Sequence, residues 1–246
     1  MFSRHPTASS LAAEQFGFSA PVDTDPASEA CIHGYPCRRQ RTVFGTYITV
    51  SVGDCGIWST GDSRGVVGVV AEILRQIAPD TDGCTLVCGI GNRSITADAL
   101  GPMVCDRLSA AFSPLCIFAP GVAAKTGIPT VPLLHAIAEV CHARRIIAVD
   151  ALAAKSRDTL GRVIQLSGDA ITPGGGSGIH AEEISARTMP CPVCTIGVPT
   201  VIRASALCGS DVTANELFVT DSAIDSLVER YAQGIAGGIA RYLAGG

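Results

Sequence analysis

Short apolar runs bounded by glycine, proline or polar residues recur along the chain. Continuous runs of this kind are typical of strands buried in a parallel sheet. They predict strands at residues 85–90, 115–119, 145–150 and 194–200. Residues 47–52 and 162–166 instead alternate apolar with polar positions, which predicts two more strands, the second nearer a sheet edge.

Longer stretches carry apolar residues three and four positions apart, as on one face of a helix. This spacing predicts helices at residues 64–78, 99–112, about 130–143 and 221–243. Pro102 is compatible with the second helix because it falls in the first turn, where its missing N–H costs little. Strands separated by helices predict an α/β fold, a three-layer sandwich with a mostly parallel sheet of the phosphorylase/hydrolase-like kind.

The first 45 residues differ from the rest of the chain. Residues 1–45 are rich in Ser, Pro, Thr, Ala and Asp and have no sustained periodicity, which predicts an N-terminal extension. Residues 46–246 then form a single α/β domain. No apolar stretch approaches the ~20 residues needed to span a bilayer, so we expect no membrane contact.

Composition narrows the classes of function. Apolar residues make up 47% of the chain and aromatics only 5%, so the core is expected to consist of Ala, Val, Ile and Leu. The net charge of -4 argues against a nucleic-acid binder, which needs a basic surface. Most of the eleven cysteines lie in apolar runs and no signal segment opens the chain, which predicts free thiols in a reducing cytoplasm.

Two aspartates are the main candidates for chemistry. Asp98 follows the predicted strand at 85–90, and Asp150 ends the one at 145–150. Parallel strands place their carboxyl ends at one edge of the sheet, where open α/β sheets hold their ligands. Two carboxyl groups a few ångströms apart share one proton, which supplies both a base to activate water and an acid to protonate a leaving amine. Thr96 is a candidate N-cap for a helix beginning near Asp98.

Other constellations carry weaker signals. No histidine follows the pattern of a serine or cysteine triad. His135 and His142 are seven residues apart and could share a helix face, but core or surface placement is favoured over metal binding. The Cys191–Cys194 pair precedes a strand, whereas a redox motif opens a helix. Cys31 and Cys37, with His33 between them, lack a second pair at zinc spacing.

A glycine-rich stretch at residues 173–178 permits close approach of the backbone to a ligand. Its glycines Gly174, Gly175 and Gly176 are candidates for substrate binding, with a floppy surface loop as the alternative. The stretch lacks the Lys-Ser/Thr ending of a phosphate-binding loop, so nucleotide binding is not expected.

Several motifs, in order, resemble those of the spore germination protease family. They are GIGNRSITADALGP (89–102), APGV (119–122), TGI (126–128), AVDALAAKS (148–156), IQLS (164–167), PGGGSG (173–178) and IGVPTV (196–201). The resemblance covers about residues 85–205.

The resemblance implies an endopeptidase that degrades small acid-soluble spore proteins during germination, cutting after glutamate. The family's catalytic aspartates fall on Asp98 and Asp150. Asn92, Arg93, Thr96 and Lys155 are then candidates for positioning the loop and the substrate. The resemblance also implies a tetramer in the forespore or spore core, made as a zymogen that loses a propeptide, and no cofactor.

Two alternatives remain open. The family's fold resembles that of hydrogenase-maturation endopeptidases, whose cleft holds a metal, so a metal-dependent peptidase using an aspartate and a histidine is one. The other is a non-catalytic spore protein with the same fold, because the sequence departs from the family pattern at Pro129, at residues 179–183 and at Arg203. Glu14 is a candidate processing point.

Overall fold

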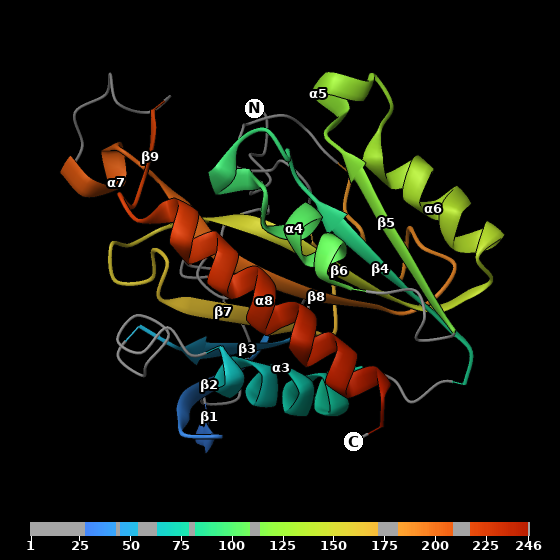
Figure 1. The fold of residues 1–246 in the computed structure, drawn as a ribbon, viewed down its shortest axis with the longest axis horizontal. Coiled ribbons are helices and arrows are strands. Elements are labelled where there is room, and N and C mark those ends of the chain that lie inside the picture. The colour runs from blue at the N-terminus through green and yellow to red at the C-terminus, as the bar shows by residue number, and fades with distance from the viewer. Residues whose placement is uncertain are drawn as a thin grey trace, which may run out of the picture.

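The computed structural model describes residues 28–42, 45–53, 63–78, 82–108, 114–171, 182–208 and 217–245. Within these ranges one sheet runs through the molecule, in the order β1-β2-β3-β7-β8-β6-β4-β5, with β9 also paired to β8 (Figure 1). The strands are β1 (Ser28–Ile32), β2 (Tyr35–Thr42), β3 (Gly45–Ser51), β4 (Cys84–Ile90), β5 (Leu115–Gly121), β6 (Ala143–Ala154), β7 (Val163–Ser167), β8 (Val193–Arg203) and β9 (Phe218–Thr220).

Helices cover both faces of this sheet. The helical elements are α3 (Arg64–Ile77), the 3-10 turn η1 (Thr96–Asp98), α4 (Leu100–Arg107), α5 (Ala123–Thr126), α6 (Thr130–Val140), α7 (Ser205–Cys208) and α8 (Ile224–Leu243). Residues of α3, α4 and α8 form one apolar core with the sheet, and α8 crosses in front of the strands in Figure 1. Residues of α6 form a second core on the opposite face. The predicted three-layer α/β architecture is therefore confirmed.

The sheet is mixed in direction, which corrects the prediction of a mostly parallel sheet. Parallel pairing joins β8, β6, β4 and β5, and all other pairs are antiparallel. The antiparallel part begins with hairpins, which need only a short turn: His33 and Gly34 between β1 and β2 both have positive φ, 50° and 84°. Parallel pairing is thus confined to β6, which carries Asp150, to β4, which precedes Asp98, and to their neighbours β8 and β5.

The sheet begins earlier than the sequence predicts. Residues 28–42, assigned above to the N-terminal extension, form β1 and β2, and Tyr35 and Cys37 lie buried in the first core. The pattern was obscured because three arginines between residues 38 and 41 interrupt the apolar positions. Residues 1–27, which include Glu14, lie outside the described residues.

Strand β7 also differs from its prediction. It was placed near an edge, but it lies between β3 and β8 and is buried along its whole length. Its alternating polar residues, Gln165 and Ser167, are buried together with it. Alternation therefore distinguished the two faces of the strand without indicating exposure.

Two of the predicted helices are shorter than expected. Of the stretch 99–112, α4 covers Leu100–Arg107, and residues 109–113 lie outside the described residues. Helix α6 ends at Val140, and His142 beyond it adopts a positive φ of 50°. Among the described helices, none combines the length and apolar character needed to cross a membrane.

Candidate active site

The loop after β4 folds back tightly and carries Asp98 at its end. Gly91 has a φ of +123°, and a Cβ there would lie 2.0 Å from the carbonyl oxygen of Asp98. The Asn92 N–H donates to Oδ2 of Asp98 at 2.7 Å, and the Asp98 N–H donates to the Ile95 carbonyl at 2.8 Å. Only glycine fits this turn, which fixes the Asp98 carboxyl group beside the end of β4.

Gly101 holds the start of α4 against the sheet. A Cβ at this position would lie 2.4 Å from the Ile90 carbonyl oxygen and 2.5 Å from that of Val149. The helix therefore rests directly on the backbones of β4 and β6. Because Asp98 lies just before α4, this contact places Asp98 close to the residue that follows Val149.

That residue is Asp150, which lies within β6 and does not end it. Pairing between β4 and β6 stops at Gly89 and Val149, whereas β6 stays paired with β8 as far as Ala154. The position at which the sequence predicted the end of β6 is thus the position at which the pairing between β4 and β6 ends. Strand alternation turns the Asp150 side chain to the face that also holds Ala148 and Leu152, the α6 side. Its side chain is buried, and Oδ1 accepts the Ala151 N–H at 2.8 Å.

The structure brings the two aspartates into electrostatic contact. Burial raises the pKa of Asp150 well above its ordinary value, the Asp98 charge raises it further, and the Ala151 N–H opposes both effects. Burial also raises the pKa of Asp98, against which the Asn92 N–H stabilises the charged form. Asp150 is the more deeply buried of the two, and its pKa is raised further above the ordinary value than that of Asp98.

The surroundings of Asp150 are apolar on the strand side. The Cys88 thiol on β4 is buried, and its pKa is raised mainly by burial, then by the nearby Cys105 and Asp150. Ile90 and Leu152 belong to the same core. Such a medium strengthens the preference of Asp150 for its neutral form.

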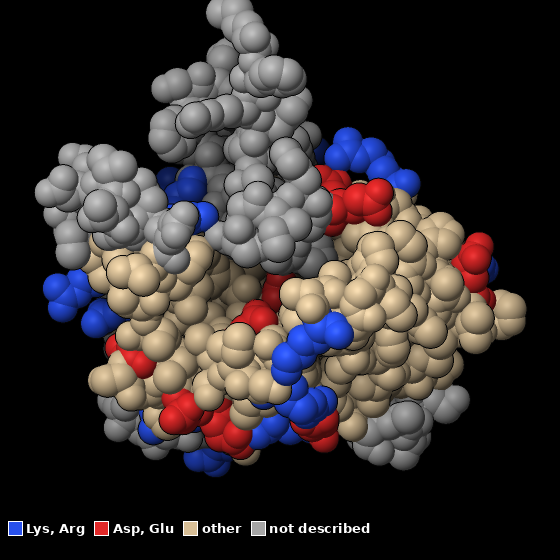
Figure 2. Space-filling model, turned by 90° about the horizontal axis from the view of Figure 1, so that it is seen from above, with Lys and Arg blue, Asp and Glu red and all other residues tan. Residues whose placement is uncertain are grey.

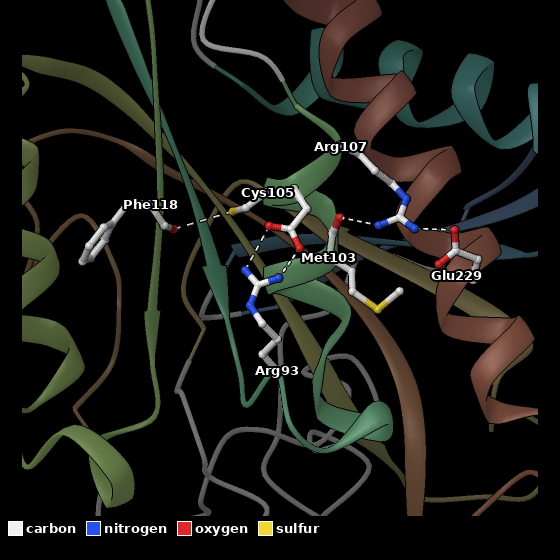
Figure 3. Close-up of polar contacts among 7 residues, drawn as sticks. Arg93, Met103, Cys105, Arg107, Phe118 and Glu229 are labelled. Carbon is white, nitrogen blue, oxygen red and sulfur yellow. Dashed lines mark hydrogen bonds and ion pairs between the residues drawn. The ribbon is translucent and has the colours of Figure 1, made fainter.

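The Arg93 side chain points toward α4, where it pairs with Asp106 (Figure 3). Its guanidinium donates to both carboxylate oxygens of Asp106, with one of the two distances 3.0 Å (Figure 3). Figure 3 also shows how α4 is attached: Arg107 donates to the Met103 carbonyl and pairs with Glu229 of α8. Arg93 therefore attaches the loop that follows β4 to helix α4.

Lys125 is a cation near the loop that sequence reasoning missed. Its Nζ donates to Oγ of Ser94 at 2.8 Å, so α5 contacts the segment that leads to Asp98. Its only sequence signal is its position between the APGV and TGI motifs.

The remaining predicted residues lie as follows. Asn92 contributes its backbone N–H to Asp98, and its Oδ1 accepts the Ser94 N–H at 3.0 Å. Thr96 lies in η1 and is half-buried; α4 has Ala99 as its N-cap and no side-chain cap, so the predicted capping role of Thr96 is not found. Lys155 is half-buried just after β6. Gly174, Gly175 and Gly176 lie outside the described residues.

Two threonines connect η1 to strands β8 and β9, and sequence reasoning did not single them out. The Thr200 hydroxyl on β8 donates to the Ala97 carbonyl at 2.5 Å, and the Thr220 hydroxyl on β9 donates to the Thr200 carbonyl at 2.6 Å. Thr200 belongs to the IGVPTV motif, which was the available signal.

The face at the carboxyl end of β5, seen from above in Figure 2, mixes both signs of charge. Acidic side chains also lie inside a hollow at the centre of that view. Over the described parts of the chain, no group of three or more His, Cys, Asp or Glu side chains is arranged to hold a metal ion. The His135 Nδ1–H donates to the Thr188 carbonyl at 2.8 Å, and Nε2 lies 3.6 Å from Oε1 of Glu139 on the same helix, α6.

Comparison of the sequence with known proteins finds germination proteases both among family models and among individual relatives. The model of the germination protease family matches residues 39–214. The chain is 31% identical to the germination protease of Clostridium tetani over 183 residues, which is 68% of this chain and 57% of that protein. It is 33% identical to that of Geobacillus sp. over 181 residues, 66% of this chain and 49% of the relative.

The chain thus spans between about half and three fifths of the length of these curated relatives. A solved structure, the [NiFe] hydrogenase maturation protease HycI from Thermococcus kodakarensis, aligns with a TM-score of 0.41 and 18% identity. The alignment covers 70% of this chain and 99% of that one.

Proposed function

This chain belongs to the germination protease family, and we propose that it is an endopeptidase that hydrolyses small acid-soluble spore proteins with water activated between Asp98 and Asp150. The observation that supports the proposal is the raised pKa of Asp150, which is caused first by burial and then by the charge of Asp98. Family membership supports the substrate class, and the acid–base pair supports the mechanism.

The two aspartates have unequal roles in this mechanism. Asp98 is only half-buried and its charged form accepts the Asn92 N–H, so it acts as the general base that removes a proton from water. The resulting hydroxide attacks the carbonyl carbon of the peptide bond. Asp150, which holds its proton through burial and charge repulsion, donates that proton to the carbonyl oxygen.

The second half of the reaction uses the same two groups in exchanged states. The tetrahedral diol collapses when Asp150, now ionised, takes a proton from one hydroxyl, and Asp98 gives its proton to the leaving amine. The C–N bond breaks, and each aspartate returns to its starting protonation state. No covalent intermediate with the protein forms.

Cations near the pair are proposed to orient an acidic substrate side chain. Lys125 contacts the loop through Ser94, and Lys155 follows the strand that carries Asp150. Arg93 contributes indirectly, because its ion pair with Asp106 holds the loop on α4. The glycines Gly174, Gly175 and Gly176 are proposed to approach the substrate backbone.

Further properties of the family are carried over as proposals. We propose a tetramer in the forespore or spore core that is made as a zymogen and loses a propeptide. Size-exclusion chromatography with light scattering tests the tetramer. Intact-mass measurement on protein from maturing spores tests processing, and a chain that keeps Met1 throughout would count against it.

The decisive experiment is digestion of a purified small acid-soluble spore protein by the purified chain, beside Asp98→Asn and Asp150→Asn. We expect cleavage by the native chain and none detectable with either variant. Undiminished cleavage by a variant would remove the acid–base pair. Loss of cleavage in chelator would favour the metal-dependent alternative. A stable complex without cleavage would favour a non-catalytic protein.

A further inference from the structure

A second group of reactive side chains lies at the opposite edge of the parallel strands. Cys84 is the first residue of β4, Cys116 the second of β5, and Cys141 caps the end of α6. The Sγ atoms of Cys84 and Cys116 are 3.4 Å apart. Cys141 is close enough to Cys116 for the Cys116 side chain to raise its pKa, after the larger effect of burial, so Cys116 lies near two other thiols. None of the three has a role in the proposed peptidase mechanism.

Strand register explains why these thiols meet. Leu86 pairs with Cys116 across β4 and β5, so Cys84 is diagonal to Cys116 and on the same face as Leu86. That face packs under α6, whose C-cap is Cys141. A disulfide has an S–S length of about 2.05 Å, so bridging Cys84 and Cys116 requires the sulfurs to approach by only about 1.3 Å.

Small molecules can reach this group. A cavity of about 620 Å³ is lined by Cys84, Glu139, His142 and Arg144, among others. Cys84, Cys116 and Cys141 are each partly exposed, in contrast to the buried Cys88 and Cys194. Among the described residues, no group of three or more His, Cys, Asp or Glu side chains is arranged to hold a metal ion.

We propose that Cys84 and Cys116 are a hydroperoxide-sensitive pair that forms a disulfide between the amino ends of β4 and β5. The Cys84 thiolate, which faces the cavity, attacks the terminal oxygen of a hydroperoxide and breaks the O–O bond. Cys84 becomes a sulfenic acid, and the leaving alkoxide or hydroxide takes up a proton from water. The Cys116 thiolate then attacks the sulfenic sulfur, forming the S–S bond and releasing hydroxide. Two electrons pass from the sulfurs to the peroxide, and a cellular dithiol reverses the change.

The environment makes this pair slow at neutral pH. Burial, followed by the hydrogen bond to Cys116, raises the pKa of Cys84 to about 11. Burial and the contact with Cys116 raise the pKa of Cys141 to about 11 as well. Glu139 of α6, His142 after it and Arg144 of β6 face the same cavity. Below its pKa a thiol gains about tenfold in thiolate for each pH unit, so oxidation should accelerate between pH 7 and pH 9.

The test is treatment of the full chain with hydrogen peroxide, followed by alkylation of the remaining thiols and peptide mapping by mass spectrometry. We expect a linked pair of peptides that contain Cys84 and Cys116, and its yield should rise steeply with pH and disappear on treatment with dithiothreitol. Cys116→Ser should abolish the link and leave Cys84 as a sulfenic acid that a dimedone probe captures.

Matched variants make the result specific. Cys141→Ser should still form the Cys84–Cys116 link, and Cys191→Ser, which alters the Cys191–Cys194 pair, should not change it. The proposal is overturned if Cys84 stays fully alkylatable after peroxide at pH 9, or if Cys116 links only to Cys141. Because Asp98 and Asp150 are not involved, these outcomes are independent of the proposed peptidase function.

Discussion

The two edges of the parallel strands gather reactive groups by different means. At the carboxyl edge, Asp98 is positioned by a loop and the start of α4. Both make close backbone contacts, at Gly91 and at Gly101, where no side chain fits. At the amino edge, Cys84 and Cys116 meet through the register of β4 and β5, although the pairing of β4 with β6 shifts between Cys84 and Thr85. The first arrangement is over-determined by steric contacts, whereas the second depends only on strand pairing.

The difference shows which edge is built for precise geometry. Acid–base catalysis requires carboxyl groups held within hydrogen-bond reach of the reacting atoms, and contacts between backbones supply that rigidity. Thiol pairing needs only one approach of two sulfurs, which side-chain rotation provides. Variants at the two edges should therefore differ in the kind of property they change.

The largest effect is expected at the aspartates themselves. Asp98→Asn and Asp150→Asn each remove a proton-transfer group, so kcat on a spore protein substrate should fall by about 10²–10⁴-fold, with little change in the far-ultraviolet circular dichroism spectrum. Cys84→Ser, at the other edge of β4, should keep activity within about twofold. If Cys84→Ser lowered kcat as much as the aspartate variants do, the proposed difference between the two edges would be wrong.

Next in size is the effect of filling the contact at the start of α4. Gly101→Ala forces a Cβ against the backbones of β4 and β6, so we expect a loss of about 3 kcal/mol in unfolding free energy by urea titration. Gly34→Ala is the control: its φ is +84° but nothing lies within 4 Å, so it should cost about 1 kcal/mol. Equal costs would mean that α4 adjusts easily.

A smaller effect concerns pH. The folded-state pKa of Asp150 is raised above its unfolded value, so the folded protein binds the proton more tightly. Its contribution to stability is therefore present at low pH and is lost as pH rises from the unfolded pKa through the folded one. Asp150→Asn stays neutral, so its Tm should exceed that of the native chain at pH 8, with the gap closing toward pH 4. A constant gap in differential scanning calorimetry would contradict this.

The smallest effect is expected at Arg93. Its ion pair with Asp106 is exposed, so Arg93→Ala should reduce the free energy of unfolding by less than about 1 kcal/mol. Lys125→Ala should raise KM for an acidic substrate more than Arg93→Ala does, because Lys125 is not paired with a carboxylate in the described structure. Steady-state kinetics on both variants decide the order.

Much of the fold could be predicted from the sequence because its signals are local. The stripe at residues 64–78 became α3 almost unchanged, and the apolar runs at 85–90 and 115–119 became β4 and β5. The strands β1 and β2 could not be predicted, because their charged residues hide an alternation that only sheet pairing makes meaningful.

For the candidate site, sequence identified the aspartates but not what holds them. The Asn92 backbone N–H on Asp98 and the Thr200 hydroxyl on Ala97 join residues from different segments, and neither follows from residue type. Likewise, Asp150 was expected at a strand end because its own run of apolar residues stops there. The structure shows instead that it is β4 that departs, at Gly91, while β6 continues.

Strand β8 has a consequence for the evolution of this site. It faces Asp150 through Gly197 and reaches the backbone beside Asp98 through Thr200, three residues further along the same strand. The positions of the two carboxyl groups relative to each other therefore depend on one segment of β8, from Gly197 to Thr200. An insertion or deletion between Gly197 and Thr200 would displace one group relative to the other, so length changes should be tolerated in the surrounding loops and rejected here.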